Sequence, residues 1–259
     1  MQDASVVRTA VFFGGLALLL ALEWRWPRAA EPLQRRLRWP ANFGLAAVDA
    51  VLLALLPLAT VGVAAWARVH GWGLLPMLGL PGWIETPLAW LILDLAIYWQ
   101  HRWLHEWRWA WPMHRVHHSD VALDASTGVR FHPAEIVLSL AWKSAVIVAL
   151  GAGPLAALAM ELALNLFALW SHASVQLSPA LERALRRLVI TPDWHRIHHS
   201  VVRAEADSNY GGSLSVWDRL FGSYTPAPRA PLDAMPVGLQ EHRSAAEQKL
   251  PALLIQPLR

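Results

Sequence analysis

Three short clusters contain eight of the chain's twelve histidines. They are His101-Arg-Trp-Leu-His105, His114-Arg-Val-His117-His118 and His195-Arg-Ile-His198-His199. A neutral imidazole keeps a free ring-nitrogen lone pair, which makes histidine the commonest metal ligand near neutral pH. A catalytic zinc takes three protein ligands and leaves one position open, so eight histidines are too many for one ion. The pattern predicts a centre that holds two metals.

The last two clusters repeat the pattern His-x-x-His-His. On a helix, residues three and four apart lie near one another, so we expect the first and second histidines of each repeat to share a face, with the third beside them. Imidazole binds Zn, Cu, Fe and Ni alike. The chain lacks the His-Glu-x-x-His motif of many zinc hydrolases, which favours redox iron. A membrane zinc hydrolase and a non-enzymatic metal-binding membrane protein remain as alternatives.

Five further polar residues are candidates for the same centre. Asp94 lies inside an apolar run and is expected either to accept a hydrogen bond from a ligand histidine or to bond a neighbouring helix. Glu161, Asn165 and His172 share a helix face by their spacing, and His172 is a candidate ligand or a core residue. His132 is a candidate ligand, proton relay or helix-start anchor.

The composition is that of a membrane protein. The chain is 55% hydrophobic and only 16% charged, whereas soluble domains are about 45–50% apolar and about 25% charged. The positive net charge of +3 comes from arginine. The sequence has no basic run interleaved with aromatic residues, which is the pattern that would indicate nucleic acid as a partner. The absence of cysteine excludes disulfides and cysteine-ligated iron–sulfur clusters, so any electrons must come from a partner or another cofactor.

Five apolar runs predict the topology, since roughly 20 apolar residues span a bilayer. They are residues 6–22, 43–66, 86–99, 133–150 and 154–170. Five arginines lie between the first two runs, so this connection is expected to be cytoplasmic. Residues 100–132 and 171–259, which hold all three clusters, then fall on the same side. The predicted fold is an all-α integral membrane bundle of four to five membrane helices with a cytoplasmic helical cap that holds the di-metal site.

These motifs resemble the fatty acid hydroxylase superfamily, also called the sterol desaturase family, of membrane di-iron enzymes. The family's three histidine motifs match the three clusters. The lead-in Asp94-x(3)-Tyr98-x(2)-His101 is also similar, as are the stretches from Leu123 to Thr127 and from Arg130 to Glu135. Downstream, Asn209-Tyr-Gly211 and the stretch from Trp217 to Gly222 resemble the family's closing signature.

The resemblance implies two iron ions held by the eight clustered histidines, with His172 and His132 completing the set and Asp94, Glu161 and Asn165 behind them. It implies O₂-dependent hydroxylation or desaturation of a C–H bond in a lipid, which could be fatty acyl, sterol or ether lipid. Electrons would come from a separate reductase, ferredoxin or cytochrome. We expect N-terminal membrane helices over 1–85, a catalytic domain over 86–225 and a tail over 226–259, in a bacterial inner membrane or an organelle membrane.

Overall fold

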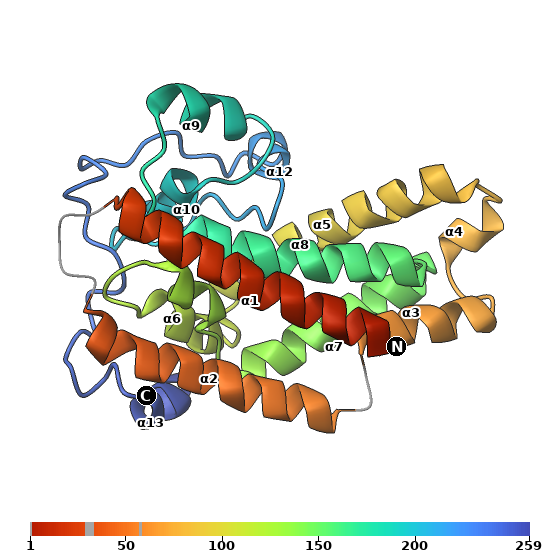
Figure 1. Cartoon of the computed structure of the whole chain (residues 1–259), viewed down its shortest axis with the longest axis horizontal. Helices are drawn as coiled ribbons and strands as arrows, with labels where there is room; N and C mark the ends of the chain where they lie inside the picture. The colour runs from red at the N-terminus through yellow and green to blue at the C-terminus, as the bar shows by residue number, and fades with distance from the viewer. Residues whose placement is uncertain (1, 29–33, 57–58) are drawn as a thin grey trace.

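The protein is a bundle of long helices with a cap of short helices at one end (Figure 1). The computed structural model describes residues 2–28, 34–56 and 59–259. Its helices are α1 Gln2–Arg25, α2 Arg35–Leu55, α3 Thr60–Val69, α4 Leu74–Met77, α5 Gly82–Glu106, α6 Trp111–His118, η1 Ala125–Val129, α7 Pro133–Leu150, α8 Pro154–His172, α9 Pro179–Leu185, α10 Pro192–His198, α11 Arg203–Ala206, α12 Val216–Leu220, α13 Leu250–Ile255 and η2 Gln256–Leu258. Within these residues, β-pairing is limited to three isolated bridges, so the predicted all-α fold is confirmed.

Five helices run along the length of the bundle in alternating directions. Figure 1 shows that α1, α5 and α8 run toward the cap, whereas α2 and α7 run away from it. The cap contains α6, α9, α10 and α13, and α3 and α4 lie at the opposite end of the molecule. All three histidine clusters therefore lie at the end where α1 passes to α2, as the topology predicted.

Among the residues that the structure describes, four stretches are long and apolar enough to cross a membrane. They are Val6–Arg25, Arg35–Met77, Pro133–Leu150 and Pro154–His172. This agrees with the predicted four to five membrane helices. The expected run over 86–99 lies in α5, which is outside this set because Glu85, Asp94 and several tryptophans lower its hydropathy.

The second predicted run, 43–66, is not one continuous helix. α2 ends at Leu55, and α3 begins at Thr60. Leu56 and Ala59 both have extended backbone conformations, with ψ of 133° and 134°. The residue before a proline is disfavoured in the helical region, so Leu56 leaves the helix ahead of Pro57. Residues 57–58 themselves lie outside the described residues.

A buried polar network joins α2 to the loop before α7. Arg38 is fully buried and donates to Asp120 and, over 3.0 Å, to Asp124. Arg130 is also fully buried and donates to Asn42 of α2 over 2.9 Å and to the Val116 carbonyl of α6 over 2.9 Å. Buried charges are tolerated only when they are paired and hydrogen-bonded. This network fixes α6 and η1 against the N-terminal half of α2.

The short helix η1 packs directly on α8. A Cβ atom at Gly128 would lie 2.3 Å from the Ala168 carbonyl oxygen, so only glycine allows this approach. Asp124 caps η1 by accepting a hydrogen bond of 3.0 Å from the Ser126 amide. The last turn of α8, which carries His172, is thereby held beside the loop that leads to Arg130.

Candidate metal centre

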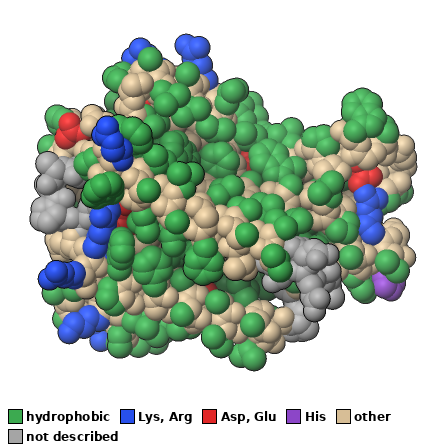
Figure 2. Space-filling view, viewed as in Figure 1, with side chains coloured by type: hydrophobic (Ala, Val, Ile, Leu, Met, Phe, Trp, Pro, Cys, Tyr) green, Lys and Arg blue, Asp and Glu red, His purple; other side chains and the backbone are tan. Residues whose placement is uncertain are grey.

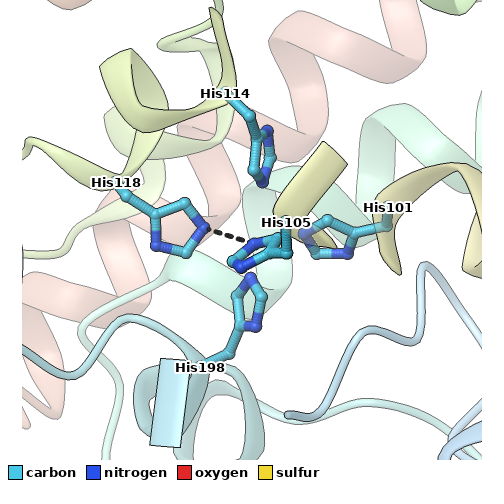
Figure 3. Close-up of side chains that lie close together, drawn as sticks. All are labelled: His101, His105, His114, His118 and His198. Carbon is cyan, nitrogen blue, oxygen red and sulfur yellow. Dashed lines mark hydrogen bonds between the residues drawn. The ribbon is translucent and has the colours of Figure 1, made fainter. Parts of the chain in front are cut away.

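Nine histidines converge in two groups inside the cap end of the bundle. Within each group, the candidate ligand atoms all lie within 4.8 Å of one another, and all nine residues are buried except His101, which is half-buried. Group one is His101, His105, His114, His118 and His198, shown in Figure 3, and group two is His117, His172, His195 and His199.

Each His-x-x-His-His motif contributes to both groups. In the first motif, His114 and His118 join group one, and His117 joins group two. The second motif is reversed, since its first and last histidines join group two and His198 joins group one. The first and last histidines of each motif therefore share a group, whereas the first and second were expected to do so. The reason is that residues four apart point in nearly the same direction on a helix, and the residue three along lies to one side. The two repeats interlock the two groups.

The outer ring nitrogens of group one are held by hydrogen-bond acceptors. The Nδ1 atoms of four histidines lie 2.6–3.2 Å from carbonyl or carboxylate oxygens, which can only accept, so each Nδ1 carries the proton. The pairs are His101 with the Tyr210 carbonyl, His105 with Asp207, His114 with Glu135, and His198 with the Ser208 carbonyl. Nε2 of His114 and of His198 are buried without a hydrogen-bond partner in the described structure, whereas Nε2 of His105 lies 3.1 Å from Nε2 of His118 (Figure 3).

Group two places nitrogen lone pairs against one another. Nε2 of His172 lies 3.0 Å from Nε2 of each of the other three histidines. Nδ1 of His172 donates to the Ala168 carbonyl over 2.6 Å, and Nδ1 of His117 donates to the Arg130 carbonyl over 3.2 Å. Since a neutral imidazole has one N–H, the Nε2 lone pairs of His172 and His117 face each other. A cation between them removes this repulsion, so both groups fit a metal ion.

Burial keeps the imidazoles in the form that binds metal. Burial, with the neighbouring imidazoles of His114 and His172, lowers the pKa of His198 to about 3, although its hydrogen bond to the Ser208 carbonyl acts in the opposite direction. Burial also holds the pKa of His118 and of His199 well below the ordinary value, and nearby histidines add to the effect. A metal ligand must be neutral imidazole, so these residues are ready to bind at neutral pH.

His132 lies outside both groups. Its Nδ1 accepts a hydrogen bond of 3.1 Å from the Ala134 amide at the start of α7, and its Nε2 donates to the Leu254 carbonyl over 3.1 Å. Both ring nitrogens are used, so the ligand role expected for His132 is not supported by the geometry. The structure instead places it as a helix-start anchor, which was one of the alternatives.

The three residues expected behind the ligands do not contact a histidine. Asp94 accepts hydrogen bonds from the Trp217 indole over 2.8 Å and from the Leu214 amide over 3.3 Å. Glu161 is paired with Arg8 over 2.8 Å, and Asn165 is exposed. Asp94 of α5 therefore has the alternative role, a structural hydrogen bond to a neighbouring element, because it binds the loop before α12 and Trp217 of α12.

Two other carboxylates support the ligands instead. Glu135 in the first turn of α7 bonds His114 and is 4% exposed, and Asp207 bonds His105. An acid at the start of an apolar helix, close to His132, was a signal that could have identified Glu135. Asp207 has no such signal, because its contact depends on how the loop after α10 folds back over α5.

A loop after α11 supplies the acceptor for His101. Asp218 accepts hydrogen bonds from the amides of Tyr210 and Gly211 over 2.7 and 2.8 Å. Burial raises the pKa of Asp218 to about 6. The Tyr98 hydroxyl of α5 shares a hydrogen bond of 2.8 Å with Ser223. These contacts hold the Tyr210 carbonyl at Nδ1 of His101. They give the Asn209-Tyr-Gly211 motif and the stretch from Trp217 to Gly222 a structural role.

Comparison with known proteins places the centre in a family. The fatty acid hydroxylase family model matches residues 86–223. The chain is 30% identical to the alkylglycerol monooxygenases of Xenopus tropicalis and Homo sapiens, over 84% and 85% of its length and 47% of theirs. It is 33% identical to an ornithine lipid hydroxylase of Rhizobium tropici, over 56% of its length and 43% of that protein.

A more distant relative is a delta(7)-sterol 5(6)-desaturase of Gibberella zeae, 27% identical over 54% of the chain. The chain spans about half the length, or less, of these curated relatives. No solved structure is significantly similar. The family match covers the three histidine clusters and the loop that supports them, and on this ground the chain belongs to the fatty acid hydroxylase family.

Proposed function

We propose that the chain is a di-iron oxygenase that hydroxylates or desaturates an unactivated C–H bond of a membrane lipid. The observation that carries the proposal is the convergence of nine histidine ring nitrogens in two groups, within each of which the candidate ligand atoms lie within 4.8 Å of one another. Imidazole ligands and a thiol-free sequence suit iron that cycles between oxidation states. The relatives' names, which include a monooxygenase, a hydroxylase and a desaturase, support the same reaction class.

Two iron ions bound by these histidines would supply an oxidant, made from O₂, that is strong enough for an unactivated C–H bond. The chain's own residues hold and orient this site. Glu135 and Asp207 fix the rings of His114 and His105 by accepting from their Nδ1 atoms, which also raises the basicity of the ligands. The burial of eight of these nine histidines would limit the access of water to the bound metals.

Hydroxylation by one O₂ consumes two electrons and two protons and yields one water. Because the chain has no cysteine, we propose that a separate electron-transfer protein supplies these electrons. We further propose that the cap faces the cytoplasm, as in a bacterial inner membrane. Arg25 ends α1, and Arg35 and Arg36 begin α2, and these two helix ends lie at the same end of the molecule as the cap. This placement of the arginines supports the orientation.

Elemental analysis of the purified protein and ¹⁸O₂ labelling of lipids test the proposal. We expect two iron ions per chain and either one ¹⁸O atom gained or two hydrogens lost in one lipid class. A zinc-loaded protein that turns over without O₂ or a reductant would instead identify a membrane hydrolase. Metal bound without any lipid product would point to a non-enzymatic metal-binding protein.

A further inference from the structure

A series of aromatic rings in contact leads from the histidine centre to the surface. It begins with Tyr210, whose ring lies against three ligands of group one. The ring centroids are 5.7 Å from His101, 5.2 Å from His105 and 5.7 Å from His198. The next ring is that of Tyr98, 6.3 Å from Tyr210. Both tyrosines are buried, so two of the chain's three tyrosines stand in line beside the ligands.

Four tryptophans in α5 and just after it continue the series. Trp99 is 5.4 Å from Tyr98, Trp103 is 6.1 Å from Trp99, and Trp107 is 5.1 Å from Trp103, all between ring centroids. Trp109 follows at 5.5 Å from Trp107, and these last two side chains are 43% and 57% exposed. We call the six residues the aromatic row: Tyr210, Tyr98, Trp99, Trp103, Trp107 and Trp109.

The row consists only of side chains that are readily oxidised. Tyrosine and tryptophan lose an electron far more easily than phenylalanine or histidine, because the phenol oxygen or the indole nitrogen donates electron density to the ring. Each step lies within the range of aromatic contacts, about 4.5–7 Å between centroids. Tryptophan also suits a membrane–water interface, but an interface does not require rings in mutual contact or buried tyrosines that reach the ligands. The chain has no cysteine that could be oxidised in their place.

The Tyr98 hydroxyl has a proton acceptor in place. It shares a hydrogen bond of 2.8 Å with Ser223, whose hydroxyl donates to Asp218 over 2.7 Å. Since a carboxylate can only accept, Ser223 donates to Asp218 and Tyr98 donates to Ser223. An oxidised phenol is a strong acid and must lose its proton. Ser223 can take this proton as it passes its own to Asp218, and both transfers reverse when Tyr98 regains an electron.

The surroundings of the tryptophans favour the outward movement of a positive charge. Arg102 lies over the Trp99 ring, 5.4 Å from its centroid, and Glu106 balances this charge only in part, over 2.7 Å. A cation at this point disfavours a positive charge that stays on Trp99. The Trp103 and Trp107 rings are stacked at an angle of 5°, so they can share one positive charge. The outer pair is therefore the more stable place for it.

We propose that the aromatic row carries oxidising equivalents out of the metal centre when no lipid C–H bond is within reach. The inference rests on the proposed function and adds a protective route that this function does not contain. One electron moves inward at each step, so the oxidised ring moves outward from Tyr210 to Trp109. A small aqueous reductant, a thiol or ascorbate, then gives one electron to the exposed ring and is itself oxidised by one electron.

Two such passages account for one unused O₂. They supply two electrons, and two protons come from water. Together with the two electrons and two protons of the normal reaction, they reduce O₂ to two waters. The row does not serve the normal supply of electrons, because each ring must first be oxidised and only a strong oxidant does this.

A second ring beside the ligands does not lead outward. Trp111 is 5.0 Å from His105. In the described part of the chain, however, its ring contacts are with histidines. Arg203 covers the Trp111 ring at 4.6 Å from its centroid, which disfavours a positive charge there.

The test uses the full chain in detergent, loaded with Fe²⁺ and reduced with dithionite in the absence of oxygen. The dithionite is removed, and O₂ is added without lipid and with catalase to destroy any released peroxide. Peptide mass spectrometry maps oxygen addition to side chains, and electron paramagnetic resonance detects tyrosyl and tryptophanyl radicals. We expect oxidation to concentrate on Trp107 and Trp109, and ascorbate added with the O₂ to prevent it.

Trp103→Phe keeps an aromatic ring but interrupts the row. We expect oxidation to shift from Trp107 and Trp109 to the two buried tyrosines, and ascorbate no longer to prevent it. Trp83→Phe, at an exposed position in the first turn of the same helix, should keep the wild-type pattern. Tyr98→Phe interrupts the row closer to the ligands and provides the same test if Trp103→Phe does not accumulate.

Oxidation that stays on Trp107 and Trp109 in both row variants would overturn the inference. So would a wild-type chain in which Trp83 is oxidised as much as Trp109, because this would indicate an oxidant that diffuses freely. Lipid products of cells that express the chain are measured in parallel. A chain that forms a lipid product but leaves the row unoxidised overturns the inference alone. A chain that shows neither result overturns the proposed function as well.

Discussion

His117 and His198 each lie in the metal group opposite to the neighbours in their own motif. Because each His-x-x-His-His turn carries histidines of both groups, a movement of either turn disturbs both groups. The rings of His118 and His199 stack with centroids 4.3 Å apart, so the groups are also in contact through ligand faces. The two metals are thus expected to be coupled in binding and in chemistry.

Alanine substitutions can separate the two groups. His198→Ala removes a ligand of group one, and His199→Ala removes a ligand of group two. We expect each variant to lose metal mainly from its own group and to lose turnover, as measured by iron content and lipid product. His132→Ala is the matched control, and it should keep both metals because its ring nitrogens bond only the backbone. Metal loss in the control equal to that in His198→Ala would contradict the assignment.

Glu135 orients one ligand through a single contact, the 2.8 Å hydrogen bond to His114. Glu135→Gln keeps the shape but removes the negative charge that strengthens the ligand. Changes of this kind cost about 10–100-fold in metal affinity or activity, and we expect such a loss in a competition titration with a chelator. Glu241→Gln, at an exposed position, should bind metal as the wild type does. Equal affinities in the two variants would show that the contact does not support the site.

At the scale of elements, the cap is joined to the bundle through charges as well as apolar packing. Arg38 of α2 reaches Asp120 and Asp124, and Arg130 connects Asn42 to α6. Burial alone would raise the pKa of Asp120, but the charges of Arg38 and Arg130 outweigh it and hold the pKa far below its usual range. The carboxylate is therefore ionised and paired at neutral pH.

Removing one partner of this network should be costly. Arg38→Met leaves two buried carboxylates without their guanidinium, and breaking a buried pair in this way destabilises a protein by about 3–5 kcal/mol. The change should appear as a lower midpoint of thermal unfolding in detergent. Arg36→Met, on the exposed side of the same helix, should unfold like the wild type. A common midpoint for the two variants would mean that the network does not stabilise the fold.

The sequence pattern predicted the positions of the helices better than the connections between them. The histidine clusters and the apolar runs were sufficient to place α5, α7 and α8. The split between α2 and α3 was missed, because a hydropathy pattern does not register the conformation before Pro57. Acceptors such as the Tyr210 and Ser208 carbonyls were also unpredictable, because any residue has a carbonyl and only the folded loop selects one.

At the scale of the whole molecule, the bundle has two chemically different ends. Figure 2 shows most of the basic side chains on this face at the cap end, with a further basic side chain beside an acidic one at the opposite end and apolar side chains covering the face between. The sequence predicted this polarity from charge bias and cluster position alone. It could not predict which side chains of α5, α7 and α8 meet inside the bundle, such as Leu93, Ile147 and Met160, since that depends on how the three helices rotate about their axes.

The orientation can be tested directly because the chain has no native cysteine. Met77→Cys lies at the end opposite the cap, and Ala245→Cys lies in the exposed segment before α13. In intact bacterial spheroplasts, a membrane-impermeant maleimide should label the first and not the second. Permeabilisation should make the second reactive. Labelling of Ala245→Cys from outside would reverse the proposed orientation.

The crowding of neutral imidazoles in the cap has a consequence for the life of the protein in a cell. Nine crowded histidine side chains, among which the Nε2 lone pairs of His172 and His117 are opposed, are held together only at a free-energy cost when metal is absent, so metal supply and cap folding are linked. A newly made chain in an iron-starved cell would insert its bundle but leave the cap loose and open to proteases. Under the proposed di-iron function, cellular iron would thereby set the abundance of the protein as well as its activity.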